Sequence, residues 1–521
     1  MTEESTRARG ALEGCRELRR ATLALSLLAV CGCHRDDDAV SSTRDGVTFV
    51  NACPYTAAFN FTATHTAPPD GIFNVRRDYG AAGDGTTDDT AAIQSAIDCS
   101  GAAAPANGQG YYGGSVFLPA GTYLITRPLS VVNTRGIHLY GAGAATVIRY
   151  QPASATVTPF AASTFPARGD SNYNTLTSAT ALLVGMFAPV GVIDVIDSLS
   201  GRFEDFTLDI RQTIGAGLRI VDACPPGGTV SSSGACTPPT GGVFYRSHIN
   251  TFRRVRIAGN GFVANAIQIG DRLARSGVSW TPTNSQNDFV TVDHCEATGY
   301  LDFGVLLSGS NSFNHRFVET RLDGGGTGQV GFAAFKESTF TWEGGGGGYH
   351  TKTDFYLGDL GGGPITIRNS RWSDDAARAS QRSPQFIRTV NWENSWPLRV
   401  TNNRVETAAG TSTAAVIDIH ATGPTVIDHN SFNLTADHDI GFFQRYCVAS
   451  DGHQMVLAFT NNTIGGRGGQ FSVAQLWGPN TTWSTVPTAS TGNTLRATVG
   501  GATITTPLAV AASTTQVCRG G

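Results

Sequence analysis

The chain has 521 residues, which is enough for several globular domains or for one long solenoid. Glycine accounts for 63 residues and charged side chains for only 15%, while 40% of the residues are hydrophobic, so frequent turns explain the composition better than disorder does. The formal net charge of −4 excludes a polycationic surface, and we expect no nucleic-acid partner.

The first 33 residues have the pattern of a bacterial export signal. Basic residues within 16–20 precede an apolar run at 21–30, which is too short to span a bilayer. Val30-Cys31-Gly32-Cys33 resembles a lipoprotein cleavage box with Cys33 as the lipidated residue, and ordinary signal cleavage nearby is the alternative. Both alternatives predict export. The protein would be either lipid-anchored in the bacterial cell envelope or extracellular. Membrane contact is expected only through that lipid, and residues 34–70 are predicted to be a polar tether and lead-in strand.

An exported protein can oxidise its cysteines, and seven of them follow Cys33. Cys224 and Cys236 bracket a loop rich in Pro, Gly and Ser, so they form the predicted disulfide. Cys295 lies inside a repeat and is expected to be a buried free thiol. By elimination, the remaining pairs are predicted as Cys53–Cys99 and Cys447–Cys518.

Residues 78–150 have the pattern of a turn, a short helix and a series of short strands. The run TTDDT at 86–90 places capping residues and two carboxylates at a helix start, where they satisfy free backbone N–H groups. One narrow apolar face follows, formed by Ala92, Ile93, Ala96 and Ile97. Short apolar runs separated by Gly, Pro and Asn then predict strands. A helix at Asp88–Cys99 ahead of many strands suits a lid over the first turn of a β-solenoid.

From Phe203 onward a short unit repeats, with starts 25 to 50 residues apart. Each unit has an apolar residue, two or three polar residues and another apolar residue, and a second apolar run follows it. Asparagine tolerates the left-handed conformation and can bond its neighbour one turn away, so recurring asparagines predict a ladder of turn residues. They occupy two adjacent positions, Asn369, Asn402 and Asn461 in one and Asn403, Asn430 and Asn462 in the next.

The N-terminal motifs resemble those of the pectate-lyase superfamily, which includes polygalacturonase-like and rhamnogalacturonase-like enzymes and phage tailspikes. The matching runs are DYGA at 78–81, GDGTTDDT at 83–90 and LPAGTY at 118–123, about a seventh of the chain. The resemblance implies an all-β fold, a single-stranded right-handed parallel β-helix over residues 71–478 with the N-terminal helix as its cap. Residues 479–521 are predicted to be a Thr-rich extension of additional strands or a covering tail.

In the resembling enzymes the substrate groove lies on the sheet formed by the second apolar run of each turn, such as residues 386–390 and 416–419. The resemblance therefore implies an exported polysaccharide-active enzyme, either a glycoside hydrolase or a polysaccharide lyase, acting on a pectin-like or other uronate-containing glycan. The alternative is a non-catalytic glycan-binding or surface-attachment protein on the same scaffold, because function depends on the site and not on the fold.

Neighbouring turns of a parallel sheet lie about 4.8 Å apart, so residues at matching positions stack. If Ile387, Thr389, Ile417 and Ile419 point inward, then Arg388, Asp418 and His420 point outward on one face. Asp439 lies just ahead of the next strand. Carboxylate pairs suit acid–base glycoside cleavage, and an arginine or histidine beside them suits proton abstraction next to a uronate carboxylate. The alternative is a solvated strand face followed by a capping turn.

Two other acidic sets compete with this cluster. Asp374 and Asp375 superficially resemble the paired aspartates of polygalacturonase-like enzymes, but they precede Ala-Ala-Arg in a predicted loop. Asp302 lies just ahead of a predicted strand, with Gln329 and Asn265 as its expected neighbours.

Tryptophans in loop-rich sequence are candidates for stacking on sugar rings. Together with Tyr349 they form a cluster of Trp342, Trp372, Trp392 and Trp396, of which the first three are the substrate-binding candidates, and packing of loops onto the solenoid is the alternative. No cysteine pair after Cys33 has C-x-x-C spacing, so a cysteine zinc site is not expected. We also expect that no cofactor is required. Calcium bridging of the carboxylates is left open, as is the oligomeric state.

Overall fold

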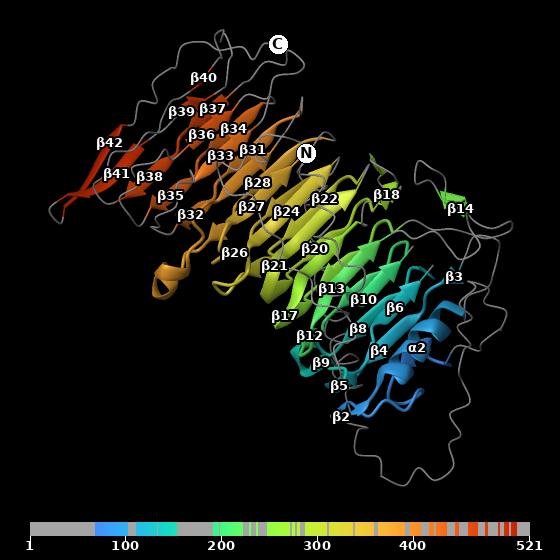
Figure 1. Ribbon diagram of the computed structural model, residues 1–521. Coiled ribbons are helices and arrows are strands. Elements are labelled where there is room, and N and C mark those ends of the chain that lie inside the picture. Colours follow the sequence, from blue (N-terminus) through green and yellow to red (C-terminus); the bar gives the residue numbers. More distant parts are fainter. Residues whose placement is uncertain are drawn as a thin grey trace, which may run out of the picture. The chain divides into compact units, whose positions relative to one another are not determined.

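In the computed structural model, Asn51–Gly521 form one compact unit built from stacked strands (Figure 1). The export signal predicted for 1–33, including Cys33, lies outside the residues that the structure describes, as does nearly all of the tether predicted for 34–70. The described residues are 68–102, 111–132, 134–153, 191–196, 198–221, 229–230, 236–237, 247–270, 274–276, 279–281, 287–309, 312–336, 339–358, 363–390, 396–407, 416–420, 424–434, 443–446, 457–466, 475–477, 488–489, 494–499 and 502–507.

Each full turn of the chain contributes strands to three rows, and equivalent strands of successive turns pair in parallel. The first row is a sheet of 13 strands in chain order. Its strands are β1 (Ile72–Asn74), β4 (Ser115–Leu118), β8 (His138–Gly141), β11 (Arg202–Glu204), β16 (Thr251–Arg253), β20 (Thr291–Asp293), β22 (His315–Val318), β25 (Phe340–Glu343), β28 (Ile365–Arg368), β31 (Leu398–Thr401), β34 (Thr425–Asp428), β37 (Leu457–Thr460) and β40 (Thr488–Ala489).

The second and third rows are joined into one 23-stranded sheet, because the long strands β17 and β21 run through both. The second row comprises β2 (Asp84–Asp88), β5 (Gly121–Ile125), β9 (Thr146–Tyr150), β12 (Thr207–Ile210), the first parts of β17 (Arg256–Ile269) and β21 (Glu296–Gly309), β23 (Arg321–Asp323), β26 (Gly346–Gly348), β29 (Arg371–Trp372), β32 (Arg404–Thr407), β35 (Ser431–Leu434), β38 (Thr463–Gly466) and β41 (Thr494–Val499).

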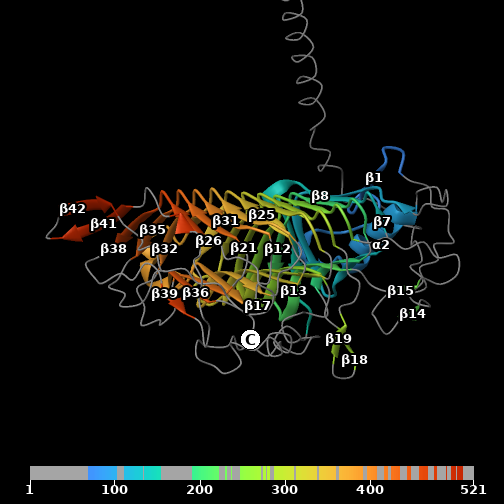
Figure 2. The same cartoon turned by 90° about the horizontal axis from the view of Figure 1, so that it is seen from above.

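The third row comprises β6 (Leu129–Val132), β10 (Gly191–Ile196), β13 (Ile214–Val221), the last parts of β17 and β21, β24 (Val330–Lys336), β27 (Thr353–Gly358), β30 (Ile387–Val390), β33 (Ile417–His420), β36 (Phe443–Tyr446) and β39 (Gln475–Trp477). Seen from above, the turns form one continuous coil (Figure 2). The predicted right-handed parallel β-helix is therefore confirmed.

Several short elements lie outside the three rows. They are the strand pairs β3 (Tyr111–Tyr112) with β7 (Thr134–Arg135), β14 (Thr229–Val230) with β15 (Cys236–Thr237) and β18 (Ala274–Ser276) with β19 (Ser279–Thr281), and the 3₁₀ helices η2 (Gly143–Ala145) and η4 (Ala376–Gln381).

The predicted N-terminal helix is α2 (Thr90–Ala102), at the opposite end of the stack from β42 (Figures 1 and 2). Ile93 and Ile97 are buried, as the apolar face predicts. Gln94 fixes the helix to β6, because its side chain donates to the Ser130 carbonyl at 2.8 Å and accepts from the Ser130 N–H at 2.9 Å. The Asp88 carboxylate accepts from the Thr90 N–H, as expected at a helix start. The role of this helix as a lid stays a prediction.

Beyond residue 478 the stacking continues. Strand β40 pairs in parallel with β37, and β41 pairs in parallel with β38. Strand β42 (Ala502–Pro507) then returns antiparallel to β41. An antiparallel return covers the otherwise free edge of the second row, where open backbone groups would invite another chain.

The predicted thiol states can be compared at two positions. Cys295 is a buried free thiol, as predicted, and burial raises its pKa to about 12. Cys99 is disulfide-bonded. The predicted Cys224–Cys236 disulfide lies outside the described residues, because Cys224 and the side chain of Cys236 are not among them. No helix among the described residues is long and apolar enough to cross a bilayer.

The connection from the first row to the second passes through one residue with a positive φ. Eight such residues have φ between 45° and 62°: Asp205, Arg254, His294, Glu319, Asn369, Asn402, His429 and Asn461. The next position carries the buried residues Asn403, Asn430 and Asn462. The Oδ1 of Asn430 accepts from the Asn403 N–H at 3.0 Å, and Asn462 receives the Asn430 N–H in the same way. The predicted asparagine ladder is confirmed.

Removing one member of the ladder should destabilise the fold. In Asn430→Ala, the Val400 carbonyl and the Asn403 N–H lose the partners they have now, at 2.8 and 3.0 Å. Because unpaired buried polar groups are unfavourable, we expect the free energy of unfolding to fall by about 3 kcal/mol, measured by urea denaturation. The exposed Asn433→Ala is the matched control and should change it by less than about 0.5 kcal/mol. Equal stability of the two variants would contradict the ladder's role.

A buried histidine in β22 makes stability depend on pH. Ser312 Oγ donates to the Asn287 carbonyl and lies 2.8 Å from His315 Nε2, so the imidazole donates its Nε2–H to this hydroxyl. Burial lowers the pKa of His315 to about 3. Since the unfolded value is about 6.5, the unfolded chain binds the extra proton between these two values.

His315 should therefore stabilise the fold above pH 6.5 and lose that contribution as the pH falls. Between pH 7 and pH 5 we expect it to lower the free energy of unfolding by about 2 kcal/mol. In His315→Leu this part of the pH dependence should disappear, with urea denaturation at both pH values as the measurement. Parallel pH profiles for the wild type and the variant would refute the assignment.

Candidate functional site

The outer face of the third row carries the predicted cluster. In β33, Ile417 and Ile419 belong to the hydrophobic core, so Asp418 between them points away from it. In β30, Ile387 is likewise in the core, which places Arg388 on the outer face.

Arg388 and Asp418 stand in register with a third outward residue, Tyr356, on neighbouring strands. Tyr356 in β27 pairs with Arg388 in β30, which pairs with Asp418 in β33. The Arg388 guanidinium carbon lies 5.8 Å from the centre of the Tyr356 ring. Asp418 is only 2% exposed. The structure thus brings Arg388 and Asp418 together on one face, and their catalytic role stays a prediction.

The other two members of the predicted cluster cannot be placed as side chains. His420 ends β33, two residues after Asp418, but only its backbone is described. Asp439 lies outside the described residues.

A second polar cluster, which we call the buried tetrad, lies where the chain enters the third row and comprises Tyr300, His350, Asp354 and Ser383. The Tyr300 hydroxyl is 2.6 Å from His350 Nε2, and His350 Nδ1 is 2.7 Å from Asp354 Oδ1. The Ser383 hydroxyl donates to the same Asp354 oxygen at 2.5 Å. The side chains of His350 and Asp354 are fully buried.

Two glycines make room for the tetrad. A Cβ on Gly304 would lie 2.8 Å from the Tyr300 hydroxyl, and one on Gly331 would lie 2.7 Å from the His350 ring. Both distances are shorter than carbon atoms tolerate, so a side chain at either position would displace the tetrad. Asp354 lies at the start of β27 and contacts the other tetrad residues from the outer side of the strand, because the neighbouring Phe355 points into the core.

The hydrogen bonds determine where the protons of the tetrad lie. Asp354 Oδ1 accepts from the Ser383 hydroxyl and from His350 Nδ1–H, which leaves Nε2 to accept from the Tyr300 hydroxyl. Burial raises the pKa of Tyr300 well above its usual value, so the phenol is protonated at neutral pH. Burial also raises the pKa of Asp354, while the bond from His350 acts in the opposite direction. Among the described residues, Asp354 Oδ2 has no hydrogen-bond partner.

Sequence reasoning missed the tetrad. A local signal was present, because His350 and Asp354 are spaced by four at the start of an apolar run that follows the glycine run 344–348. The contribution of Tyr300 and Ser383 had no such signal, since they come from other turns of the coil.

The prediction that Trp342 and Trp372 bind sugar is wrong. Both side chains are fully buried, with their ring centres 5.4 Å apart, and Trp372 also packs edge-on against Phe355 at 4.8 Å. Their indole N–H groups donate to the Gly344 carbonyl and the Ser370 hydroxyl. They occupy inward positions of β25 and β29, where a sugar cannot reach them. Trp392 lies outside the described residues.

Two of the three competing aspartates, Asp302 and Asp375, have structural partners. Asp302 lies within β21 rather than ahead of a strand, is 2% exposed and accepts from Gln329 Nε2 at 2.7 Å. Asp374 and Asp375 are exposed and precede η4. Asp375 caps that helix by accepting from the Ala377 N–H. A metal site is not formed by the described residues, which contain no group of three or more His, Cys, Asp or Glu side chains suited to one.

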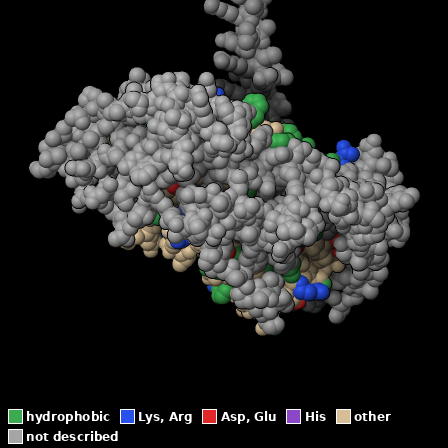
Figure 3. All heavy atoms as spheres, turned by 45° about the horizontal axis from the view of Figure 1, so that its top comes forward, with side chains coloured by type: hydrophobic (Ala, Val, Ile, Leu, Met, Phe, Trp, Pro, Cys, Tyr) green, Lys and Arg blue, Asp and Glu red, His purple; other side chains and the backbone are tan. Residues whose placement is uncertain are grey.

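On the face shown in Figure 3, side chains of described residues emerge at separate points, with the blue Lys and Arg side chains apart from one another. The candidate groups of the third row are mostly buried.

Comparison with known proteins supports the resemblance in the N-terminal part. Residues 72–183 match the family model "Rhamnogalacturonase A/epimerase, pectate lyase-like", which confirms the resemblance for that segment. The chain is 54% identical over 54 residues to mannuronan C5-epimerase AlgE3 of Azotobacter vinelandii, which is 10% of this chain and 2% of that protein. It is 45% identical over 76 residues to AlgE1 of the same organism, 14% of this chain and 5% of that protein.

Solved structures of polysaccharide-active enzymes align with the chain at low sequence identity. The A-module of the Azotobacter vinelandii mannuronan C-5 epimerase AlgE6 aligns with a TM-score of 0.43 and 17% identity, covering 81% of this chain and 98% of that one. The catalytic unit of a GH87 α-1,3-glucanase from Streptomyces thermodiastaticus aligns with a TM-score of 0.36 and 15% identity, covering 83% and 70%.

The core position of Trp372 can be tested by truncation. Trp372→Ala removes a buried indole and leaves a cavity, so we expect the free energy of unfolding to fall by about 3–5 kcal/mol in urea denaturation. Trp396, which is 51% exposed, is the matched control, and Trp396→Ala should cost less than about 1 kcal/mol. A small effect at Trp372 would restore the sugar-binding interpretation.

Proposed function

We propose that this protein is an exported polysaccharide-active enzyme that acts on a uronate-containing glycan at the outer face of the third row. The observation that carries the proposal is the Tyr300–His350–Asp354 chain of hydrogen bonds. The matched family model and the mannuronan C5-epimerase relatives support the substrate class. Export belongs to the same proposal and is tested by locating the natural chain after cell fractionation.

The proposed reaction begins with removal of the proton from the sugar carbon next to the carboxylate. Tyr300 is fully buried in this structure, so the reaction requires that the surface above Gly304 opens to admit the sugar. Tyr300 then passes its hydroxyl proton to His350 Nε2, and the phenolate oxygen accepts the proton from carbon. The imidazolium formed in this way is stabilised by Asp354, whose carboxylate contacts Nδ1–H at 2.7 Å. A base oriented by a second group, which is itself held by a carboxylate, follows the logic of a catalytic triad. Ser383 holds the carboxylate in place.

Arg388 is the candidate for binding the uronate carboxylate. It is one strand away from β27, which carries Asp354, and its side chain is partly exposed. A guanidinium paired with the carboxylate would stabilise the negative charge that develops when the adjacent proton leaves.

Two outcomes follow from the resulting carbanion. Expulsion of the glycosidic oxygen gives an unsaturated sugar and makes the protein a lyase, whereas return of a proton to the opposite face inverts the carbon and makes it an epimerase. Hydrolysis would instead need two carboxylates on either side of the glycosidic bond. The Oδ1 of Asp354 already accepts from His350 and Ser383, so the geometry favours proton abstraction.

A non-catalytic glycan-binding protein is the second candidate. It is favoured by the burial of the tetrad, because a fully buried polar network also serves to fix the conformation of a core.

The deciding assay incubates the purified full chain with polymannuronate, polygalacturonate and a neutral glucan in deuterated water. A lyase produces ultraviolet-absorbing unsaturated ends, and an epimerase incorporates deuterium at carbon 5 without shortening the chain. New reducing ends without ultraviolet absorbance would indicate a hydrolase and refute proton abstraction. Retention of a polymer without any change would favour the binding protein.

Replacing Tyr300 tests the assigned base. Tyr300→Phe keeps the ring and removes only the hydroxyl that contacts His350, so we expect the turnover rate on the uronate polymer to fall at least 100-fold. Tyr140→Phe is the matched control, because Tyr140 lies in the first row, and it should retain wild-type turnover. Full turnover in Tyr300→Phe would overturn the mechanism.

A further inference from the structure

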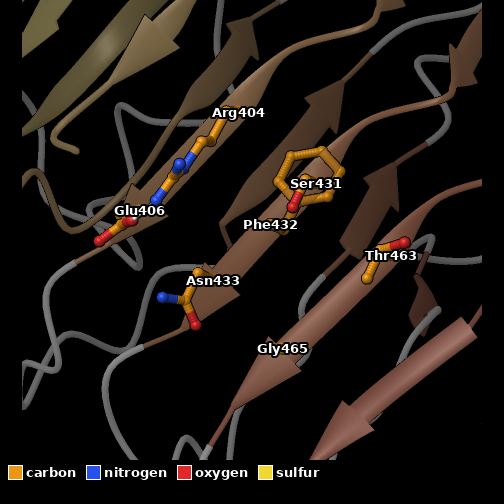
Figure 4. A pocket seen from close by; sticks show the side chains of 7 residues that line it. All are labelled: Arg404, Glu406, Ser431, Phe432, Asn433, Thr463 and Gly465. Carbon is orange, nitrogen blue, oxygen red and sulfur yellow. Dashed lines mark hydrogen bonds and ion pairs between the residues drawn. The ribbon is translucent and has the colours of Figure 1, made fainter. Parts of the chain in front are cut away.

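A hollow of about 330 Å³ opens on the outer face of the second row (Figure 4). Its volume is at the lower end of the range of about 300–1,000 Å³ found for ligand sites. It is lined by Arg404, Glu406, Ser431, Phe432, Asn433, Thr463 and Gly465. These residues come from β32, β35 and β38, three neighbouring strands.

The register explains why the surface is hollow here. One outward line across the strands runs from Arg404 to Ser431 and Thr463. A parallel line runs from Glu406 to Asn433 and ends at Gly465. Side-chain size decreases along this line, and Gly465 has no side chain. Glycine weakens a strand interior and often marks the place where a ligand approaches closely.

The charges at one end of the hollow are held in fixed positions. Glu406 is 4% exposed and lies between two arginines, the buried Arg382 and the exposed Arg404. Arg404 Nη2 donates to Glu406 Oε1 at 2.9 Å, and Figure 4 shows its side chain extended toward Glu406. The other N–H groups of Arg404 have no partner among the described residues. The exposed Arg371 is its register partner in β29.

This end of the hollow is therefore cationic, since one carboxylate faces two guanidinium groups and a third arginine stands beside them. The remaining lining supplies the Ser431 and Thr463 hydroxyls and the Asn433 amide, which are donors and acceptors suited to sugar hydroxyls. Arginine is the side chain best suited to a planar carboxylate.

We infer that this hollow is a second glycan-binding site, which takes one acidic sugar residue with its carboxylate on Arg404. Glu406 positions the Arg404 guanidinium, and the space over Gly465 receives the sugar ring. Because successive turns are about 4.8 Å apart, Arg371 lies next along the stack to pair with the carboxylate of an adjoining sugar. The site would hold an acidic polymer on a face different from the one proposed to react. The inference rests on the second row alone and does not require the proposed function.

The test measures binding of a tetragalacturonate and of a neutral cellotetraose to the full chain by titration calorimetry. The tetragalacturonate should bind, and both Arg404→Gln and Gly465→Val should weaken it at least tenfold, the first by removing the cation and the second by filling the space. Valine suits a strand, so the second variant is expected to fold. Arg399→Gln, an exposed arginine of β31 in the same turn, is the matched control and should bind as the wild type does.

Wild-type affinity in both Arg404→Gln and Gly465→Val would overturn the inference, and so would equal binding of cellotetraose. Turnover measured on the same variants distinguishes a failure of this inference from a failure of the proposed function. Tyr300→Phe should retain tetragalacturonate binding at the hollow, while Arg404→Gln should lose that binding and keep the turnover of a short uronate oligomer.

Discussion

Backbone hydrogen bonding between successive turns is the constraint on which the rest of the structure depends. A parallel strand bonds a neighbour on each side, so every turn needs the next one at a spacing of about 4.8 Å. That requirement aligns residues from distant parts of the chain, as in the Phe203–Phe252 stack, whose ring centres are 4.8 Å apart. The buried asparagine ladder extends the same bonding through the turns, where the backbone alone would leave polar groups unpaired.

The same stacking pairs opposite charges, because side chains of neighbouring turns form ion pairs. Arg219 bonds Asp194 at 2.7 Å, Arg254 bonds Asp205 at 2.6 Å and Arg368 bonds Glu343 at 2.8 Å. The more exposed pairs, Arg254–Asp205 and Arg368–Glu343, contribute little stability each, whereas Arg219–Asp194 is largely buried. Against that background, the exposed guanidinium of Arg404 is a place where an outside anion can bind, whereas the Oδ2 of Asp354, which has no hydrogen-bond partner among the described residues, is buried.

Outward glycines connect both candidate sites. Gly304 and Gly331 leave room above the third row, and the side chains of Tyr300 and His350 occupy it. Gly465 leaves room above the second row, where the hollow lies. In a coil whose faces are otherwise covered by side chains, the position of a glycine decides where a polar cluster or a ligand can sit. Two faces of one scaffold can in this way carry separate tasks, with reaction proposed on one and polymer binding on the other.

Local periodicity and turn chemistry predicted a stacked coil, the helix near its start and the asparagine ladder, and the N-terminal motifs implied the parallel β-helix through their family resemblance. Strand alternation also sufficed to put Arg388 and Asp418 on one outer face. The inward orientation of Trp342 and Trp372 could not be predicted in this way, nor could the meeting of Tyr300, His350, Asp354 and Ser383. Those four come from three different turns, and the loops between turns vary in length. The vertical neighbours of a residue are therefore set by the stacking of the whole coil, which no local pattern records.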